Sequence, residues 1–349
     1  MNQTVYVGLS GGVDSSVAAA LLLQAGYKVV GVFMKNWSRD VGGVRCPWKE
    51  DLASARSVSA HLNIELKVYD FEEQYFAAVA QYMIDAYRKG LTPNPDIMCN
   101  AEIKFKVFAE RCFAEGADYI ATGHYARVEQ QNDKVVLRRA VDTNKDQTYF
   151  LYRAPAKNLA RTLFPLGDMY KSEVRKLAEE LGLPTAQRPD SQGLCFVGNI
   201  PMRTFLGEFI EPKQGDIVDR KGNVIGRHEG AFFYTIGQRQ GLGVGGGRPY
   251  YVYAIDVDKN EVHVTTEPES NVLNRADFRI TDSVWFSTPT EGKSYDVQVR
   301  YRTPAKPGKL VGHEQDWRVK LDQPERAVTP GQSAVLYDGD VVVGGGIIA

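Results

Sequence analysis

Cysteine is scarce in this chain, and its few cysteines are not spaced to share a metal ion. The 349 residues include four cysteines, Cys46, Cys99, Cys112 and Cys195. They are too few and too scattered for a disulfide framework in a chain of this length. No C-x-x-C or paired Cys/His spacing occurs, which disfavours a zinc site. In a reducing compartment, the cysteines are therefore interpreted either as buried thiols or as residues with a chemical role.

Long hydrophobic runs and an excess of one charge are also missing. No apolar run reaches the roughly 18 residues that a membrane span needs, and no charged-then-apolar leader opens the chain. We therefore expect a soluble, cytoplasmic protein. The net charge is −1, with 42 Lys and Arg against 43 Asp and Glu. This balance excludes the overall basic field of a nonspecific nucleic-acid binder, although a local basic patch stays possible.

Strand and helix patterns alternate in the first half of the chain and predict a doubly wound parallel sheet. After about residue 205 short β-rich runs with many glycines dominate, as is typical of small barrels or sandwiches. The 43% apolar residues suffice for several cores. The predicted domains are an α/β domain over residues 1–204, a small β-rich domain over 205–271 and a C-terminal β-barrel over 272–349.

The most informative segment is VYVGLSGGVDSS at residues 5–16, which predicts a phosphate-binding loop. An apolar strand over Val5–Leu9 ends at Ser10-Gly11-Gly12, and a helix follows. A strand, a glycine turn and a helix N-terminus bring free backbone N–H groups and the positive end of the helix dipole to one point. The Walker A and G-x-G-x-x-G patterns are both absent. A further glycine, Gly123, follows another predicted strand and falls at the same edge of the sheet.

Two of the cysteines occupy segments rich in turn-forming residues. Cys99 lies in TPNPDIMCN, which predicts a Pro-stiffened loop ahead of a helix that starts near Glu102. A thiol near a helix N-terminus has a stabilised thiolate, and Asp96 is the nearest candidate acid or base. A small buried residue is the other interpretation of Cys99. Cys195 lies in a similar segment, whereas Cys46 and Cys112 are interpreted as structural.

Several sequence blocks in order carry a resemblance to a known family. SGGVDSS resembles the pyrophosphate loop of the N-type ATP pyrophosphatases. With FMKNW, TPNPDIMCNAEIKF, ATGHYAR, KDQTYFLY, DSQGLCFVG and TIGQRQGLG, the chain resembles the bacterial tRNA-specific 2-thiouridylases nearly end to end. One departure is visible, because the loop before Cys195 reads Ser-Gln-Gly-Leu-Cys where the family pattern has Ser-Thr-Gly-Ile-Cys.

The resemblance implies a role for each of several residues. Cys99 would be the nucleophile, Cys195 the persulfide carrier, and Asp96 the acid or base; the two cysteines would form a transient disulfide. The ATP site would comprise Gly8, Leu9, Ser10, Gly11, Gly12, Val13, Asp14, Ser15, Met34 and Gly123, with Asp14 also helping to place Mg²⁺. The target base would contact Asn94, Pro95 and Asp96. The tRNA contacts would be His124, Lys145, Asp146, Gln147, Arg300, Tyr301 and Gln332.

The resemblance also implies the reaction and the partners. The enzyme would adenylate O2 of the wobble uridine with ATP and then transfer sulfur from a cysteine persulfide. Its partners would be tRNA of the Lys, Glu and Gln type and a protein that donates persulfide sulfur. We expect a monomer. Two other functions share the loop: an adenylating amidotransferase or ligase, which would not need Cys99 and Cys195, and a nucleotide-binding RNA-association module without catalysis.

Overall fold

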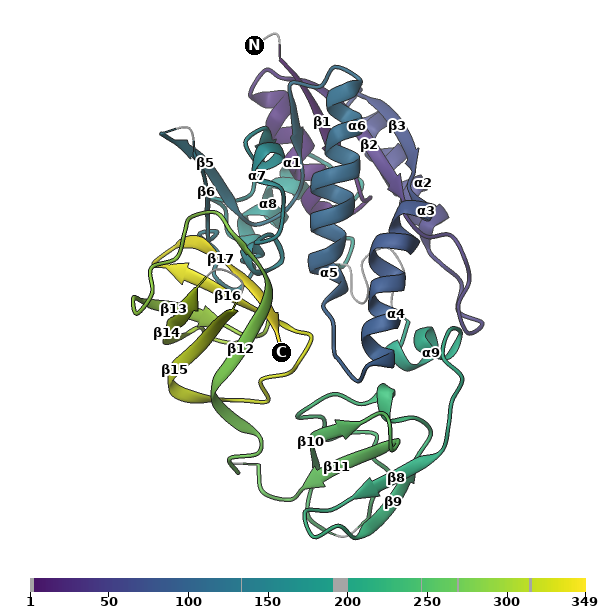
Figure 1. Cartoon of the computed structure of the whole chain (residues 1–349). Coiled ribbons are helices and arrows are strands. Elements are labelled where there is room, and N and C mark those ends of the chain that lie inside the picture. Colours follow the sequence, from purple (N-terminus) through teal and green to yellow (C-terminus); the bar gives the residue numbers. More distant parts are fainter. Residues whose placement is uncertain (1–2, 133, 191–199, 246, 269, 314–315) are drawn as a thin grey trace. The chain divides into compact units, whose positions relative to one another are not determined.

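The chain divides into two compact units. The structure is a computed structural model that describes residues 3–132, 134–190, 200–245, 247–268, 270–313 and 316–349 (Figure 1). The first unit comprises Met1–Ala80, Pro95–Ile200 and Asp340–Val342, and the second comprises Gln81–Asn94, Pro201–Gly339 and Val343–Ala349. Each unit is therefore built from segments that are distant in the sequence.

A five-stranded parallel sheet forms the centre of the first unit, in the order β3-β2-β1-β4-β7. Its strands are β1 (Thr4–Gly8), β2 (Lys28–Lys35), β3 (Glu65–Asp70), β4 (Tyr119–Ala121) and β7 (Thr162–Leu163). The strand order reverses between β1 and β4. Open α/β sheets bind ligands outside the carboxyl ends of the strands at such a reversal. The predicted phosphate loop follows β1, and Gly123 follows β4, so both lie at the expected place.

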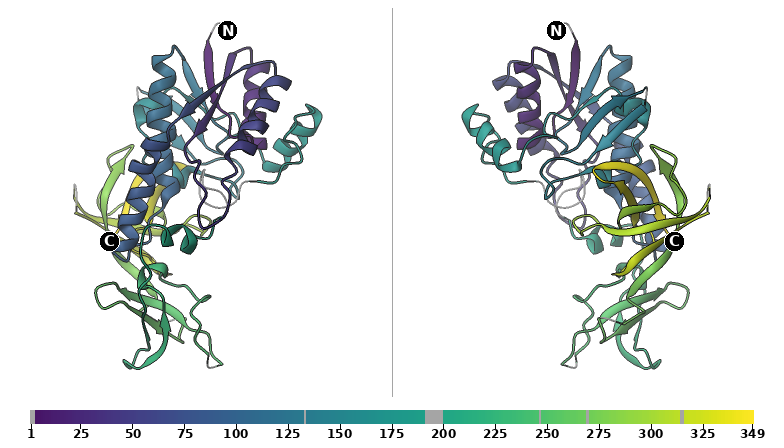
Figure 2. Two further views of the ribbon diagram at one scale, coloured as in Figure 1. Left: turned by 90° about the vertical axis from the view of Figure 1, so that its right-hand side faces the viewer. Right: turned by 90° about the vertical axis from the view of Figure 1, so that its left-hand side faces the viewer.

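Helices cover both faces of this sheet (Figure 2). On one face, α1 and α2 pack Leu22 and Val58 against Phe33 of β2. On the other face a long helix runs through α5, η2 and α6, and Tyr6 of β1 donates a hydrogen bond to the carbonyl of Glu115 at its end, at 3.4 Å. The helical segments are α1 (Val13–Gln24), α2 (Trp48–His61), α3 (Glu72–Tyr75), η1 (Phe76–Ala80), α5 (Pro95–Met98), η2 (Cys99–Phe108), α6 (Ala109–Ala114), η3 (Thr148–Phe150), α7 (Ala156–Leu159) and α8 (Lys171–Glu180). A hairpin of β5 (Arg127–Gln131) and β6 (Lys134–Arg138) completes the unit.

One predicted helix boundary is wrong. The sequence predicts a loop through Cys99 and a helix from near Glu102, but the helix begins at Pro95. Proline is favoured at the first position of a helix, because its missing N–H would have no intrahelical acceptor there. Pro95 therefore starts the helix rather than stiffening a loop, and Cys99 lies in the second turn instead of before the first.

The second unit is rich in strands, as the sequence predicts. Four strands form a small sheet in the order β10-β11-β8-β9, and strands β12 to β17 form a barrel that the pairing of β12 with β17 closes. Its elements are α4 (Gln81–Arg88), α9 (Met202–Gly207), β8 (Gly215–Val218), β9 (Val224–His228), η4 (Ala231–Phe233), β10 (Tyr251–Asp256), β11 (Glu261–Thr265), β12 (Asn274–Trp285), β13 (Ser294–Gln298), β14 (Lys306–His313), β15 (Asp316–Arg326), β16 (Ser333–Asp338) and β17 (Val341–Ile348), whose first residues belong to the first unit. The predicted fold class, an α/β domain followed by two small β-rich parts with a barrel last, is confirmed.

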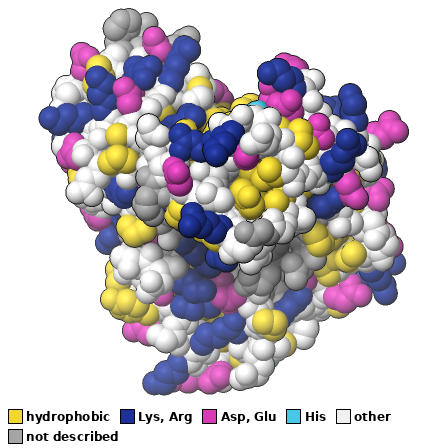
Figure 3. All heavy atoms as spheres, turned by 90° about the horizontal axis from the view of Figure 1, so that it is seen from below, with side chains coloured by type: hydrophobic (Ala, Val, Ile, Leu, Met, Phe, Trp, Pro, Cys, Tyr) yellow, Lys and Arg dark blue, Asp and Glu magenta, His cyan; other side chains and the backbone are white. Residues whose placement is uncertain are grey.

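Charged side chains of both signs are mixed on the surface. Figure 3 shows one face, on which Lys and Arg side chains form several separate groups with acidic side chains between them. This distribution agrees with a net charge of −1. In the part of the chain that the structure describes, no helix is both long and apolar enough to span a bilayer.

Glu115 joins the α6 end of the long helix to strand β3, and we expect it to make stability depend on pH. Lys67 donates a hydrogen bond to its carboxylate at 2.8 Å and Tyr69 donates another at 2.7 Å. These hydrogen bonds, that of Lys67 first, lower the pKa of Glu115 from 4.5 to about 2. Because the folded-state pKa is the lower one, the stabilisation is present above pH 4.5 and is lost as the pH falls toward 2.

Glu115→Gln is therefore expected to lower the free energy of unfolding at pH 7, and the difference from wild type should shrink as the pH falls through that window. Urea unfolding at several pH values measures it. Glu110 lies in α6 of the same helix and forms an exposed ion pair with Lys157 of α7, so Glu110→Gln should change the free energy of unfolding little. A Glu115→Gln deficit that stays constant from pH 7 down to pH 3 would contradict the assignment.

Candidate functional site

The segment after β1 has the geometry of an anion-binding loop. Gly11 has a φ of +78°, which a residue with a side chain rarely adopts, and Gly12 precedes α1 in an extended conformation. The Ser15 hydroxyl lies 3.3 Å from the Ser10 hydroxyl and donates to the carbonyl of Gly12 at 3.1 Å. Among the described residues, no acceptor faces the backbone N–H groups of Gly11 or of Val13 to Ser15, the first three residues of α1. Together with the helix dipole, these free donors favour a phosphate.

The backbone of the loop is held by hydrogen bonds from residues that the sequence patterns did not indicate. The carbonyl of Gly11 accepts hydrogen bonds from Arg188 at 2.7 Å and from the Ser54 hydroxyl at 2.8 Å. Arg188 also forms an ion pair with Asp51. Because the Gly11 carbonyl is bonded on one side of the loop, the backbone N–H groups of the loop face the opposite side. The loop is therefore set in shape before any ligand arrives, which reduces the entropy that binding costs.

Gly123 makes a close approach that explains why the site has a glycine there. A Cβ atom at this position would lie 2.7 Å from the carbonyl carbon of Asp14 and 2.7 Å from the nitrogen of Ser15. Gly8 is similarly close to a neighbour, because a Cβ there would lie 3.2 Å from Cε of Met34. The structure thus places the predicted ATP-site residues of β1, β2 and β4 side by side at the carboxyl edge of the sheet.

Asp14 belongs to an ion-pair network that sequence reasoning missed. Lys171, the first residue of α8, reaches both carboxylate oxygens of Asp14 at 2.6 and 2.8 Å and lies 2.8 Å from Asp190. Asp190 also pairs with Lys145 at 2.8 Å and Arg175 at 2.6 Å. Although partial burial opposes it, the hydrogen bonds from Lys145 and Lys171 keep the pKa of Asp190 below its ordinary value. No local pattern marks Lys171, which is 157 positions from Asp14.

Replacement of Lys171 should disturb this network measurably. Lys171→Gln removes the positive charge between the carboxylates of Asp14 and Asp190. Among the described side chains, Asp14 then keeps the hydroxyl of Tyr125 as a hydrogen-bond donor, at 2.9 Å. We expect a loss of about 1.5–3 kcal/mol in the free energy of unfolding, as for hydrogen bonds to charged groups. Weaker ATP binding should accompany it. Urea unfolding and titration calorimetry measure both.

Lys176 offers a matched control on the same helix. It lies 3.5 Å from Glu180 and both side chains are largely exposed, so Lys176→Gln should change neither quantity by more than a few tenths of a kcal/mol. Equal effects of the two substitutions would show that the Lys171 network contributes nothing specific.

Cys99 is fully enclosed in the first unit. Its exposed fraction is 0%, and it lies at the start of η2, one turn after Asp96. Cys195, the other predicted reactive cysteine, lies outside the described residues. Cys46 and Cys112 are buried thiols outside any disulfide of the described residues, and burial raises the pKa of both. The structural interpretation of Cys46 and Cys112 agrees with this placement.

The predicted tRNA contacts of the first unit are largely engaged within the protein. His124 is buried, its Nδ1 lies 2.8 Å from the Thr122 hydroxyl, and burial lowers its pKa well below the usual range. Asp146 is buried and pairs with Arg139 at 3.0 Å. The side chain of Gln147 accepts a hydrogen bond from the backbone of Tyr125 at 2.9 Å. These groups hold the region after β4 in shape, and their contact with tRNA stays a prediction.

In the second unit, Gln332 supports the segment that precedes the Cys99 helix. Its side-chain amide donates to the carbonyl of Thr92 at 2.8 Å and to that of Pro93 at 3.3 Å. Arg300 donates to the carbonyl of Ala327 at 3.3 Å. The two residues therefore have structural partners, and Gln332 holds the two residues that precede Asn94 in the chain.

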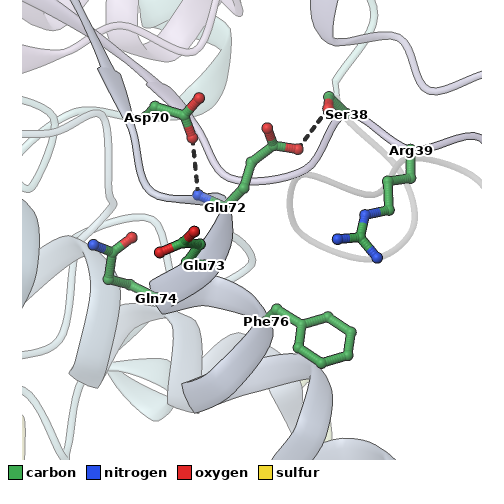
Figure 4. A pocket seen from close by; sticks show the side chains of 7 residues that line it. All are labelled: Ser38, Arg39, Asp70, Glu72, Glu73, Gln74 and Phe76. Atoms are coloured by element: carbon green, nitrogen blue, oxygen red, sulfur yellow. Dashed lines mark hydrogen bonds between the residues drawn. The ribbon is translucent and has the colours of Figure 1, made fainter.

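The carboxyl ends of β2 and β3 border an open cavity of about 590 Å³ (Figure 4). Its lining residues are Ser38, Arg39, Asp70, Glu72, Glu73, Gln74 and Phe76. Glu72 is held by Lys35 and by the Ser38 hydroxyl, which donates to it at 2.5 Å. The acidic groups are therefore partly compensated. Within the described residues, no group of three His, Cys, Asp or Glu side chains could hold a metal ion.

Family models match nearly the whole chain. Residues 3–199 match the tRNA methyl transferase HUP domain, residues 203–266 the tRNA methyl transferase PRC-barrel domain, and residues 275–348 the aminomethyltransferase beta-barrel domain. The first of these ranges contains the phosphate loop, Cys99 and the position of Cys195.

Full-length relatives share close to half of the sequence. The tRNA-specific 2-thiouridylase MnmA of Neisseria meningitidis serogroup C is 47% identical over 348 residues, which cover 99% of this chain and 95% of the relative. The protein of the same name from Alcanivorax borkumensis is also 47% identical, over 99% of this chain and 96% of its own. Among solved structures, a 4-thiouridine synthetase–RNA complex with bound ATP resembles this chain only distantly. The two are 16% identical with a TM-score of 0.36, and the match covers 57% of this chain and 46% of the synthetase.

Proposed function

Because the chain belongs to the tRNA-specific 2-thiouridylase family and is thus a tRNA sulfurtransferase, we propose that it uses ATP to replace O2 of the wobble uridine with sulfur. The observation that carries this proposal is the preformed loop of Ser10 to Ser15 in the same unit as the enclosed thiol of Cys99. A phosphate site and a candidate nucleophile in one unit suit a reaction that activates with ATP and then transfers sulfur.

ATP is proposed to bind along the carboxyl edge of β1, β2 and β4. The free N–H groups of the loop and the hydroxyls of Ser10 and Ser15 would hold the β and γ phosphates. Met34 and Gly8 would line the adenine or ribose side, with Gly123 allowing the close approach of the loop. The predicted set of Gly8 to Ser15, Met34 and Gly123 is supported by their common location.

These residues do not form a separate binding site for Mg²⁺. Both oxygens of Asp14, the predicted ligand, already accept hydrogen bonds from Lys171, and one carboxylate is a poor cage for an ion that demands octahedral coordination. The residues present therefore do not fit a resident Mg²⁺. An ion that arrives with ATP, bound mainly to its phosphates, is compatible with this arrangement.

The chemistry proposed has two stages. First, O2 of the uridine attacks the α phosphate of ATP and pyrophosphate leaves, so that the oxygen becomes part of a good leaving group. Second, the terminal sulfur of a Cys195 persulfide attacks C2 and AMP departs with O2. The thiolate of Cys99 then attacks the Cys195 sulfur, which releases 2-thiouridine and forms a Cys99–Cys195 disulfide; a dithiol reductant restores both thiols. In a variant of this route, Cys99 first releases hydrosulfide, which attacks C2 itself.

The remaining assignments concern RNA. Asp96, one turn before Cys99, is proposed as the acid or base, and Asn94 to Asp96 as the segment that meets the target base. His124, Lys145 to Gln147, Arg300, Tyr301 and Gln332 are proposed to face tRNA. The target nucleotide must leave its stack to reach an enclosed thiol, as enzymes acting on bases generally require.

Partners and location complete the proposal. A protein that carries a persulfide would supply the sulfur, and the substrates would be tRNAs of the Lys, Glu and Gln type. We propose a cytoplasmic monomer.

Mass spectrometry of nucleosides tests the function directly. Unmodified tRNA is incubated with the protein, magnesium and a persulfide source, with and without ATP. The expected result is 2-thiouridine at the wobble position only when ATP is present. Release of pyrophosphate without thiolated uridine would instead favour an adenylating amidotransferase or ligase, and ATP binding without pyrophosphate release would favour a noncatalytic RNA-association module.

A further inference from the structure

Asn36 is a buried amide with no hydrogen-bond partner in the part of the chain that the structure describes. Its exposed fraction is 1%, and among the described residues it is the one side chain whose nitrogen and oxygen are both enclosed and both unpaired. Since both terminal atoms lack partners, this conclusion does not depend on which of them is assigned as nitrogen.

An unpaired buried amide lowers the stability of the folded protein. A buried amide that gives up water without gaining a partner destabilises the folded state, and each case in a native protein calls for an explanation. A buried amide elsewhere in the same unit shows the usual solution: Asn158 is 4% exposed and donates to the carbonyl of Phe105 at 2.7 Å. Asn36 therefore differs from an ordinary core amide in having both of its polar atoms free for a ligand.

Strand geometry places Asn36 on the face of the sheet that the Cys99 helix covers. Gly8 and Met34 lie on this face, because a Cβ on Gly8 would be 3.2 Å from Met34 and 3.9 Å from Phe108 of η2. The next residue, Lys35, points to the opposite face, where its ammonium lies 5.2 Å from the ring of Trp48 in α2. Side chains alternate along extended backbone. Asn36 therefore returns to the Met34 side, one residue beyond the end of β2.

A second unpaired polar atom lies on that helix. Asn100, next to Cys99 in η2, is 3% exposed, and its side-chain oxygen has no partner among the described residues. The amide nitrogen of Asn100 donates to the carbonyl of Phe150 in η3 at 3.4 Å, so only its oxygen resembles Asn36 in lacking a partner among the described residues. The helix that covers the Asn36 face of the sheet therefore carries both this oxygen and the enclosed thiol of Cys99. In this fold class, ligands bind at the carboxyl ends of the strands, and Asn36 directly follows that end of β2.

We propose that Asn36 is a base-binding residue, whose amide nitrogen donates to O4 of the target uracil and whose oxygen accepts from its N3–H. This inference rests on the proposed function. A carboxamide presents a donor and an acceptor side by side, which match the adjacent acceptor and donor on that edge of uracil. Pairing there leaves O2 and C2 free for adenylation and sulfur transfer. Asn36 and Cys99 are both enclosed, so binding of the base has to expose both groups.

Asn36→Leu separates this role from a structural one. Leucine has the same number and branching of heavy atoms as asparagine but no polar atom, so the variant should melt at a higher temperature than wild type, because the desolvation cost of the unpaired amide is removed. ATP affinity should be unchanged, while kcat/KM for thiolation of tRNA should fall about 10- to 100-fold, the range that one bidentate base contact supplies. Asn158→Leu is the matched control; it breaks a formed hydrogen bond and should melt at a lower temperature.

A substrate change makes the test specific for the base. An anticodon stem-loop with 2-pyrimidinone at the wobble position lacks both O4 and N3–H. The wild-type enzyme should thiolate it poorly, and Asn36→Leu, or Asn36→Ala if leucine is not accommodated, should show no further loss, since both changes remove the same contact.

Three results would overturn the inference. The first is a lower melting temperature for Asn36→Leu that Asn36→Ala reproduces, which indicates an internal water or other structural partner. The second is weaker ATP binding, which indicates that Asn36 contacts adenine, and the third is unchanged thiolation. Failure of the wild-type protein to form any 2-thiouridine would instead refute the proposed function, and is recognised because it does not depend on the variant.

Discussion

Cys99→Ser is expected to abolish formation of 2-thiouridine, with a fall of about 10³-fold or more, as is common when a nucleophile is removed. Serine is nearly the size of cysteine but is not ionised at neutral pH and cannot form a disulfide. The side chain is fully buried at the start of η2, so the variant should retain the fold. It should also retain ATP binding and tRNA-dependent release of pyrophosphate, because these precede the step assigned to the thiol. Nucleoside mass spectrometry and a pyrophosphate assay measure the two halves separately.

Cys112 provides the matched control. It too is fully buried, in α6 of the same helix, and burial raises its pKa. Cys112→Ala should leave thiolation per folded molecule unchanged. Thiolation by Cys99→Ser at the wild-type rate would remove Cys99 from the mechanism. Loss of pyrophosphate release together with thiolation would mean that the substitution acts on the ATP site or on tRNA binding instead.

Gly123→Ala should have the second largest effect, by displacing the phosphate loop. The new Cβ would lie 2.7 Å from two backbone atoms at the start of α1 and 3.0 Å from Cβ of Asp14. Backbone atoms cannot rotate away as a flexible side chain can, so α1 or the end of β4 must shift. A displacement of about 1 Å in a positioned site can reduce turnover about 10²-fold. We expect that loss in thiolation, and a weaker binding of ATP measured by titration calorimetry.

A glycine in open space supplies the comparison. At Gly207, the last residue of α9, an added Cβ would meet no atom within 4 Å. Gly207→Ala should leave both ATP affinity and thiolation as in wild type, and alanine should slightly favour the helix. If Gly123→Ala bound ATP with wild-type affinity, the loop would not depend on the close approach of β4.

Much of the first unit could be predicted from consecutive residues. The phosphate loop is encoded by an apolar strand, two glycines and an Ala-rich helix, all within residues 5–25, and the structure has these elements in that order. The helix through Cys99 was harder to delimit. Proline is typical both of loops and of the first helical turn, so the residues around Pro95 do not by themselves distinguish the two.

Contacts between distant segments could not be predicted in this way. Lys171 meets Asp14 across 157 positions, and Arg188 reaches Gly11 across 177. A lysine at the start of a helix carries no local sign of its partner, because its long side chain is compatible with many surroundings. The same holds for Asn36, whose unpaired state depends on which groups the fold brings around it.

The sequence by itself determined the strand–glycine–helix loop, the alternation of strands and helices, the change to β-rich structure and the positions of the candidate nucleophiles. These features depend on residues near one another in the chain, where sterics and periodicity act directly. The tertiary structure alone decided which cations hold Asp14, that Gly123 touches the loop, and that Cys99 and Asn36 are enclosed. Burial and long-range pairing follow from how the sheet and helices pack, and that packing is a property of the whole unit.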